Sequence, residues 1–268
     1  RFDDAEKYLT KLLQTGQRKG EAQYYLGRIY ESRSQYQQAI DWYGRVQNGE
    51  YRFDAQIRSA NLLATQGQTD LAIEQLKNMA SNSQSKASLV RIYLAKGEVL
   101  NQAKRYHAAI EIYNQALLII PGNIDLLYAR GLTGEKVGNL QMLEDDMQTI
   151  LQTEPDNAHA LNALGFTLAD RTDRIQEAFG YLEKAIEIKP DDPAIIDSGS
   201  YAAISSSPLR SVRFSGTQTP GSLSRSIALS TRNPPLAFNI EPENILVKSV
   251  RQYPNRSTTR SSAPNRFL

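Results

Sequence analysis

The chain of 268 residues contains no cysteine. This absence excludes disulfides, thiolate catalysis and cysteine-ligated metal sites, but a chain without thiols suits oxidising and reducing compartments equally. No run of about 18 apolar residues is present, so no transmembrane helix is expected. No secretory leader is visible either, because the chain opens on Arg1-Phe2-Asp3-Asp4, which already reads as helix. A removed leader or a missing start would produce such an opening.

Signatures of common catalytic and nucleotide-binding sites are also missing. The sequence holds no P-loop, no G-x-G-x-x-G after a strand and no G-x-S-x-G, and no Ser–His–acid arrangement follows from the spacing. Its two histidines, His107 and His159, each lack a second histidine at ligand spacing, so neither a metal nor a cofactor is expected. The run Glu144-Asp145-Asp146 is interpreted as a solvated helix face, with a cation or a basic partner as the minor alternative. The sequence therefore predicts a protein that is not an enzyme.

Charge is divided unevenly along the chain. Residues 1–197 hold 22 basic and 27 acidic side chains, whereas residues 198–268 hold nine basic and two acidic ones. The formal net charge of +2 thus combines a first part of about −5 with a tail of about +7. This change of composition predicts two different segments that join near residue 197.

A pattern that returns every 33–37 residues dominates the first segment. In each copy a leading residue, usually alanine, is followed four residues later by a large apolar or aromatic one, and several copies close on a proline, as at Pro121. The leading residues are Ala5, Ala39, Ala72, Ala109, Leu143 and Ala178, and their large partners are Leu9, Tyr43, Leu76, Tyr113, Met147 and Leu182. The apolar positions within each copy repeat with the period of an amphipathic helix.

A second helix is expected before each of these helices, and it carries a small residue in its middle. The small residues are Gly27, Ala60, Gly97, Gly131 and Gly165. Because glycine inside a helix costs about 1 kcal/mol relative to alanine, its recurrence needs a reason. Close approach of the two helices of one repeat supplies that reason, and stacking of the repeats supplies the buried surface that one repeat cannot provide alone.

The 34-residue period, the motif Leu26-Gly27-x-x-Tyr30, the motif Ala109-x-x-x-Tyr113 and the closing prolines resemble the tetratricopeptide repeat (TPR). The resemblance covers about residues 1–197, with a leading half repeat, five full repeats and the opening of a sixth. It implies an all-α, right-handed superhelical solenoid of about 5.5 repeats. The first helix of each repeat would line an open concave groove.

The groove positions that the TPR frame selects combine aromatic and aliphatic anchors with polar groups. Such a mixture suits an extended peptide or a partner helix, in which a few buried anchors carry most of the binding energy. The candidate partner-binding residues are Tyr24, Arg28, Ile57, Asn61, Arg91, Leu94, Glu98, Tyr128, Leu132, Asn162 and Phe166. The set of Lys, Asn and Arg residues with which one TPR subclass grips a peptide carboxylate is incomplete here, so that clamp is not predicted.

A narrower resemblance rests on the stretch Leu161-Asn162-Ala163-Leu164-Gly165-Phe166 and on Pro190-Asp191-Asp192-Pro193. Both look like the TPR lipoproteins of the Gram-negative outer membrane, some of which act as adaptors for a periplasmic carboxyl-terminal processing protease. The resemblance implies an exported scaffold on the periplasmic side of the outer membrane, with that protease or cell-wall enzymes as partners. Membrane attachment would require a lipid-bearing cysteine that this sequence does not contain.

The repeat pattern stops after Asp197. Residues 198–268 contain twenty Ser or Thr and seven Pro, a composition that cannot bury enough apolar surface to offset chain entropy. One interpretation is a disordered basic tail. The other, which the break in mid-repeat favours, is that a shift of reading frame near codon 198 replaced the original end. In either case the last repeat lacks its cap, and fraying is expected from about Ile186 onward.

These observations favour an interaction scaffold or adaptor that holds a protein partner. A structural module that associates with itself and a cytoplasmic TPR regulator without a client peptide are the alternatives. Nucleic-acid binding is not expected, because the aromatic residues among the tail arginines are too scattered for a stacking platform.

Overall fold

The computed structural model describes residues 2–16, 18–83 and 85–205, together with the side chains of these residues as far as Gly199. The described part is all-helical, with twelve α-helices and no β-strand. The helices are α1 (Phe2–Gln14), α2 (Lys19–Ser32), α3 (Tyr36–Gly44), α4 (Tyr51–Thr65), α5 (Thr69–Ser81), α6 (Lys86–Gln102), α7 (Tyr106–Ile119), α8 (Ile124–Lys136), α9 (Leu140–Thr153), α10 (Ala158–Arg171), α11 (Ile175–Ile188) and α12 (Pro193–Ser205).

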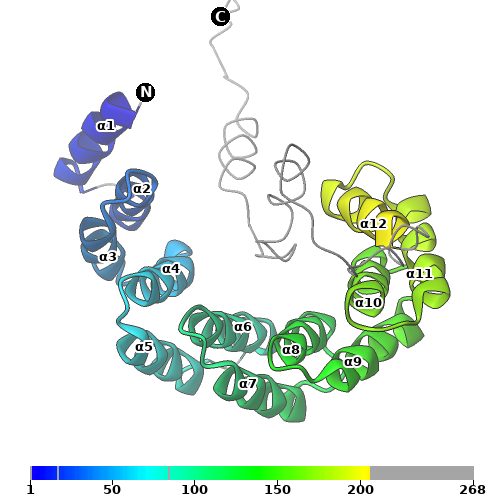
Figure 1. Ribbon diagram of the computed structural model, residues 1–268. Helices are drawn as coiled ribbons and strands as arrows, with labels where there is room; N and C mark the ends of the chain where they lie inside the picture. Colours follow the sequence, from blue (N-terminus) through cyan, green and yellow to red (C-terminus); the bar gives the residue numbers. More distant parts are fainter. Residues whose placement is uncertain (1, 17, 84, 206–268) are drawn as a thin grey trace, which may run out of the picture. The chain divides into compact units, whose positions relative to one another are not determined.

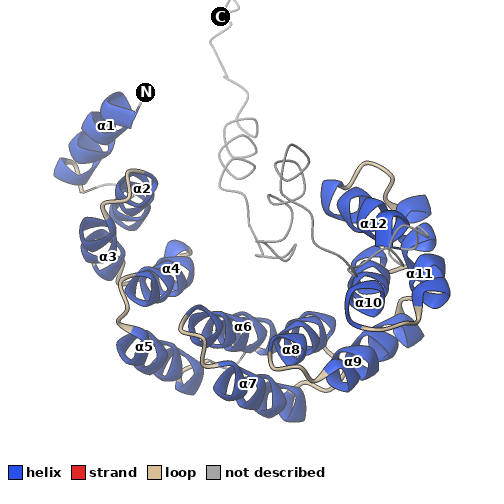
Figure 2. Ribbon diagram, in the orientation of Figure 1, coloured by secondary structure: helices blue, strands red, loops and turns tan. Residues whose placement is uncertain are grey.

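The helices stack in the order of the chain and form two rows (Figure 1). The pairs α2–α3, α4–α5, α6–α7, α8–α9 and α10–α11 are the five full repeats, with α1 before them and α12 after them. Short loops connect every pair (Figure 2). Consecutive first helices contact one another from α2 through α4, α6, α8 and α10 to α12. The first helices thus make one continuous row, as the sequence predicts.

Each repeat is closed by a contact between its small residue and its large one. In the five full repeats the leading residues Ala39, Ala72, Ala109, Leu143 and Ala178 are fully buried, whereas Ala5 on α1 is exposed. The large partners Tyr43 and Tyr113 are only 1% and 2% exposed. A Cβ atom added to Gly27 would lie 2.5 Å from the Tyr43 ring, and one added to Gly97 would lie 2.1 Å from the Tyr113 ring. The predicted close approach is confirmed, because no side chain fits where these rings lie.

Asparagine and glycine residues in the turns before α8 and α10 define the starts of these helices. The side chains of Asn123 and Asn157 are N-caps, and they accept hydrogen bonds of 3.0 Å from the backbone N–H groups of Leu126 and Ala160. Gly122, in the turn before α8, has a φ of 71°, which glycine adopts without strain. These caps satisfy donors at the helix starts that have no partner within the helix.

Helix α12 continues to Ser205, beyond the expected boundary at residue 197. It contacts both α10 and α11, and Ile195 is fully buried. Ser198, where the composition changes, is 2% exposed and donates a hydrogen bond to the Ala194 carbonyl. Contacts with α10 and α11, through residues such as Ile195 and Ser198, hold the helix on both sides of the expected boundary. Residues 206–268, to which the disordered-tail and frame-shift interpretations apply, lie outside the described residues, and the fraying from Ile186 stays a prediction.

Replacing Gly97 with alanine should destabilise the chain although alanine is the better helix former. The added methyl group overlaps the buried Tyr113 ring, and overpacking of this kind costs about 1–3 kcal/mol, against about 1 kcal/mol gained in helix propensity. Urea unfolding followed by circular dichroism measures the difference. Gly180→Ala, within α11, is the matched control, because a Cβ there meets none of the described atoms within 4 Å, so the alanine should stabilise the helix. An unchanged midpoint for Gly97→Ala would contradict the close-contact explanation.

Candidate partner-binding face

The predicted partner-binding residues all lie on the first helices α2, α4, α6, α8 and α10. We call the surface that these helices present together the first-helix face. The structure divides the predicted residues into three groups by exposure. Arg91 and Glu98 are exposed; Arg28, Ile57, Asn61, Leu94, Leu132 and Phe166 are half-buried; Tyr24, Tyr128 and Asn162 are buried. The buried group is therefore held within the chain, and the other two groups form the accessible part of the face.

An ion-pair and tyrosine network connects the first three repeats across this face. The Tyr24 hydroxyl on α2 donates to Asp54 on α4, and Arg58 donates to the same carboxylate at 2.9 Å. Arg91 on α6 donates to the other Asp54 oxygen at 2.9 Å. Arg58 also reaches Glu31 at 3.2 Å. Three consecutive first helices thus share one carboxylate.

Two further groups complete this network. The buried hydroxyl of Tyr43 donates to Glu31, and the Arg28 guanidinium lies 3.4 Å from the Tyr24 hydroxyl oxygen. Arg91 also lies over the Phe53 ring, 4.6 Å from its centroid. The charged groups are therefore paired within the protein, as partly buried charges must be to offset desolvation.

The network keeps Asp54 ionised. Burial by itself raises the pKa of the Asp54 carboxyl, but the hydrogen bond from Tyr24 and the charges of Arg58 and Arg91 outweigh it, so the pKa is lowered. Burial and the adjacent Asp54 carboxylate raise the pKa of Tyr24, and burial with the neighbouring Glu31 raises that of Tyr43. Both tyrosines therefore remain neutral hydrogen-bond donors at physiological pH.

The middle of the face, on α6 and α8, is more open. Glu98 and Asp125 are exposed and form no ion pair with a Lys or Arg among the described residues. The half-buried Leu94 and Leu132 pack their inner sides against the core. Asn101 donates to the Thr133 hydroxyl at 3.0 Å and thereby connects α6 with α8. This part of the face offers apolar surface and negative charge together.

Three amide oxygens near the face are buried without a hydrogen-bond partner among the described residues. They belong to Asn61, Asn101 and Asn162. A buried polar group without a partner costs about 1–3 kcal/mol, and such groups are uncommon in native proteins. Two of the three amides are predicted partner-binding residues.

At the last part of the face, α10 contacts the end of α11. The Lys189 ammonium lies 2.9 Å from Nε2 of His159, and burial together with this cation lowers the pKa of the imidazole. A neutral imidazole nitrogen can accept a hydrogen bond from Lys189. The structure therefore places His159 in a contact with the next loop. No group of three metal-ligating side chains occurs in the described part of the chain.

The sequence interpretation missed Arg58 and Thr133, which connect neighbouring repeats. Arg58 follows Asp54 by four residues, a spacing at which opposite charges pair on one helix face. This spacing in the sequence could have identified Arg58 as a partner of Asp54. No local sequence pattern identifies Thr133, because its hydrogen-bond partner Asn101 lies 32 residues earlier, in the preceding repeat.

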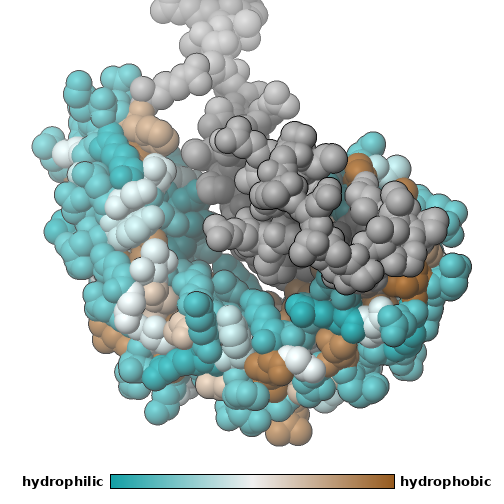
Figure 3. All heavy atoms as spheres, viewed as in Figure 1, coloured by the Kyte–Doolittle hydropathy of each residue, from teal (hydrophilic) through white to brown (hydrophobic). Residues whose placement is uncertain are grey.

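The visible surface of the described residues is mainly hydrophilic, with hydrophobic residues in small separate areas (Figure 3). The large exposed apolar side chains include Phe2, Tyr8, Leu71, Leu118 and Ile119. None of the helices in the described ranges combines the length and the hydropathy that a membrane span requires.

Comparison with protein families confirms the repeats. Models described as tetratricopeptide repeat match residues 1–55 and residues 90–123 and 158–192. A TPR repeat-containing protein of Pseudomonas aeruginosa is 37% identical over 177 residues, which cover 66% of this chain and 30% of that protein. A protein of Arabidopsis thaliana called CTR9 homolog is 26% identical over 137 residues, 50% of this chain and 12% of that protein. The chain thus spans less than a third of either relative.

Solved structures agree with this assignment of the fold. A thermophilic TPR protein from Thermus thermophilus superposes with a TM-score of 0.51 at 19% identity, covering 69% of this chain and 99% of that one. A tetratricopeptide repeat protein from Parabacteroides merdae gives a TM-score of 0.53 at 15% identity, covering 69% and 73%. The predicted all-α TPR solenoid is therefore confirmed for the described part of the chain.

The stability of the Asp54 network should depend on pH. Because the pKa of Asp54 is lowered in the folded chain, its contribution is present above the unfolded pKa of about 3.9 and is lost as the pH falls through the folded value. We expect Asp54→Asn to lower the unfolding free energy by about 1–3 kcal/mol at pH 7, and this difference should shrink below about pH 4. Urea titrations at both pH values measure it.

Asp125→Asn is the control for this experiment, because Asp125 is exposed and lies outside the network. It should change the unfolding free energy by less than about 0.5 kcal/mol at either pH. A difference between wild type and Asp54→Asn that stays constant from pH 7 to pH 3 would contradict the assigned ionisation of Asp54.

Proposed function

We propose that the chain is a protein-interaction scaffold that holds a peptide or a partner protein on its first-helix face. The observation that carries this proposal is the open part of the face on α6 and α8. There the exposed carboxylates Glu98 and Asp125, without Lys or Arg partners among the described residues, accompany the half-buried side chains of Leu94 and Leu132. A partner with apolar anchors and cationic side chains complements such a surface in both shape and charge.

The two halves of the face are expected to contribute differently. On α2 and α4 the charged groups are already paired with one another, so a ligand gains little there without breaking an internal contact. On α6 and α8, Glu98 and Asp125 form no ion pair among the described residues, although Glu135 at the end of α8 pairs with Arg171. We therefore place the energetically dominant contacts on α6 and α8.

The narrower proposal is an adaptor for a carboxyl-terminal processing protease and its substrates on the periplasmic side of the bacterial outer membrane. Its support is the resemblance of residues 161–166 and 190–193 to outer-membrane TPR lipoproteins. A cytoplasmic TPR regulator is the alternative. Expression from the natural start of the gene, followed by cell fractionation, separates the two, since the periplasmic proposal requires export.

Cross-linking from the first-helix face tests the interaction function. We expect the full chain with a photo-reactive amino acid at Leu132 to capture a defined partner from an envelope extract. Substituting both Glu98 and Asp125 by Lys should weaken this capture at least about tenfold, because like charges then face a cationic partner. Quantification of the cross-linked band measures the change. The same amino acid at Leu71, an exposed residue of α5 in the other row, is the matched control.

Two results would overturn parts of this proposal. Equal capture from Leu71 and from Leu132 would show that the first-helix face is not the binding surface. A purified carboxyl-terminal processing protease that does not change the fluorescence anisotropy of the labelled full chain would exclude the adaptor proposal for that protease. This second result would leave the broader scaffold function in place.

A further inference from the structure

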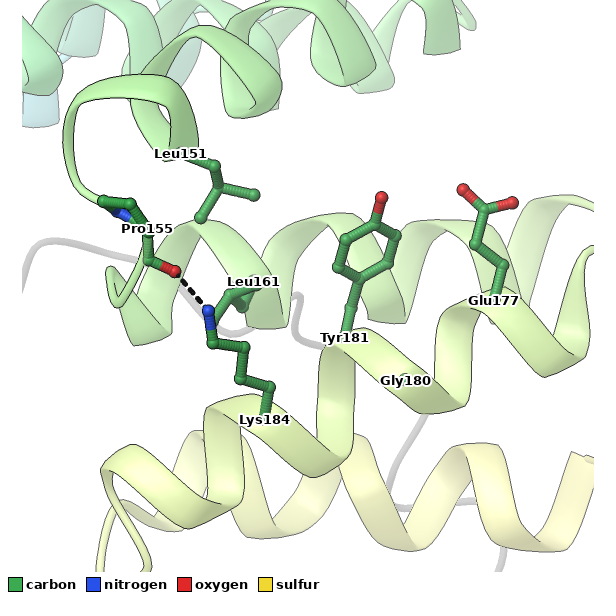
Figure 4. A pocket seen from close by; sticks show the side chains of 7 residues that line it. All are labelled: Leu151, Pro155, Leu161, Glu177, Gly180, Tyr181 and Lys184. Carbon is green, nitrogen blue, oxygen red and sulfur yellow. Dashed lines mark hydrogen bonds between the residues drawn. The ribbon is translucent and has the colours of Figure 1, made fainter.

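A pocket of about 520 Å³ lies away from the first-helix face, between the second helices α9 and α11. Leu151 of α9, Pro155 of the following loop and Leu161 of α10 lie across from α11 (Figure 4). The α11 side is formed by Glu177, Gly180, Tyr181 and Lys184, which recur at helical spacing on one face. The pocket is thus a mostly apolar hollow with a charged residue at each end of its α11 side.

Gly180 is the residue that opens this pocket. It occupies the position two residues after the leading residue of its repeat, and the four preceding full repeats hold a carboxylate there: Asp41, Glu74, Glu111 and Asp145. Glycine within a helix costs about 1 kcal/mol relative to alanine. No neighbour in the described part of the chain requires it, because a Cβ at Gly180 would meet none of the described atoms within 4 Å. Unlike Gly27 and Gly97, this glycine has no packing reason among the described residues.

A second departure from the repeat pattern lies on the same row of helices. Leu118, near the end of α7, is 84% exposed. The other full repeats carry polar residues at this position: Asn48, Ser81, Gln152 and Glu187. Ile119, next to it, is 47% exposed. An exposed leucine where its equivalents are polar is an apolar projection that packing within its own repeat does not explain.

We propose that a second copy of this chain occupies the pocket, with Leu118 of each copy seated over Gly180 of the other. The two unusual residues complement each other. Leu118 presents an exposed apolar side chain, and Gly180 lacks the carboxylate that would occupy the space above the pocket. The projection and the pocket both lie on the row of second helices, α7 preceding α9 and α11. A two-fold axis can therefore form both contacts at once, as in most homodimers.

The charges at the edges of the contact agree with this pairing. Glu111 lies seven residues before Leu118, on the same face of α7, and forms no ion pair among the described residues. Lys184 stands at one end of the pocket, where its ammonium donates to the Pro155 carbonyl at 2.8 Å and pairs with the exposed Asp156 at 3.1 Å. Glu111 is thus the one carboxylate that α7 brings to the contact, opposite a Lys184 whose ammonium also has partners in its own chain.

Analytical ultracentrifugation of the full chain, at concentrations up to about 0.2 mM, tests the proposal. We expect the 30.0 kDa chain to form a reversible dimer.

Two substitutions test the contact itself. Leu118→Gln removes the exposed apolar side chain, and Gly180→Asp restores the carboxylate of the other repeats. Each should raise the dissociation constant at least about tenfold, since both apolar contacts of the dimer are lost together. Gly180→Asp should not destabilise the monomer, because the position is open, and thermal melting checks this.

A mixture of the two variants makes the test specific. The Gly180→Asp copy keeps its leucine and the Leu118→Gln copy keeps its pocket, so the mixed dimer retains one intact contact and should associate more tightly than either variant alone. Leu71→Gln, which removes another exposed leucine, should leave the dimer unchanged. A wild-type chain that stays monomeric, a dimer insensitive to both substitutions, or a mixture without recovery would each overturn the proposal.

Discussion

The contact between a small residue on the first helix and a large residue on the second is the constraint on which the other packing depends. Where Gly27 and Gly97 lie, the rings of Tyr43 and Tyr113 fill the space that a side chain would need. This contact sets the separation of the two helices in a repeat. Because one repeat cannot bury its apolar stripe alone, that separation is transmitted to the next repeat through stacking. The continuous row of first helices is the result.

This row brings together side chains that are about one repeat apart in sequence. Tyr24, Asp54 and Arg91 come from three successive repeats and meet around one carboxylate. Their mutual pairing has a functional consequence, because charges that satisfy one another leave little for a partner. In the described part of the chain, Glu98 on α6 and Asp125 on α8 have no such ion-pair partner, whereas Glu135 at the end of α8 pairs with Arg171. The internal network therefore connects the first repeats, and the proposed binding surface lies in the middle of the solenoid, where Glu98 and Asp125 are exposed.

Much of the fold follows from the sequence, since the repeat period, the small and large residues and the closing prolines all indicate the same helical pairs. The details of the face do not follow. Tyr24 and Asn162 occupy groove positions in the repeat frame, yet both are buried. The repeat frame does not contain the cause, since Tyr24 packs against the rings of Tyr43 and Tyr51 and donates to Asp54 of the next repeat. The end of α12 at Ser205 was likewise not predictable from composition, since contacts with α10 and α11 hold Ser198 in a helix that its neighbours in sequence do not suggest.

In a repeat protein, the residue at one position can be compared with its equivalents in the other repeats of the same chain. When the same position holds a carboxylate in four repeats and glycine in the fifth, the comparison is made within one chain and one packing environment. At Gly97 a helical glycine is explained by the ring that replaces its side chain, whereas at Gly180 the space remains open. The first glycine serves packing within a repeat. The second lowers helix stability and has no packing reason among the described residues, and the proposed contact with Leu118 of a second copy would supply one.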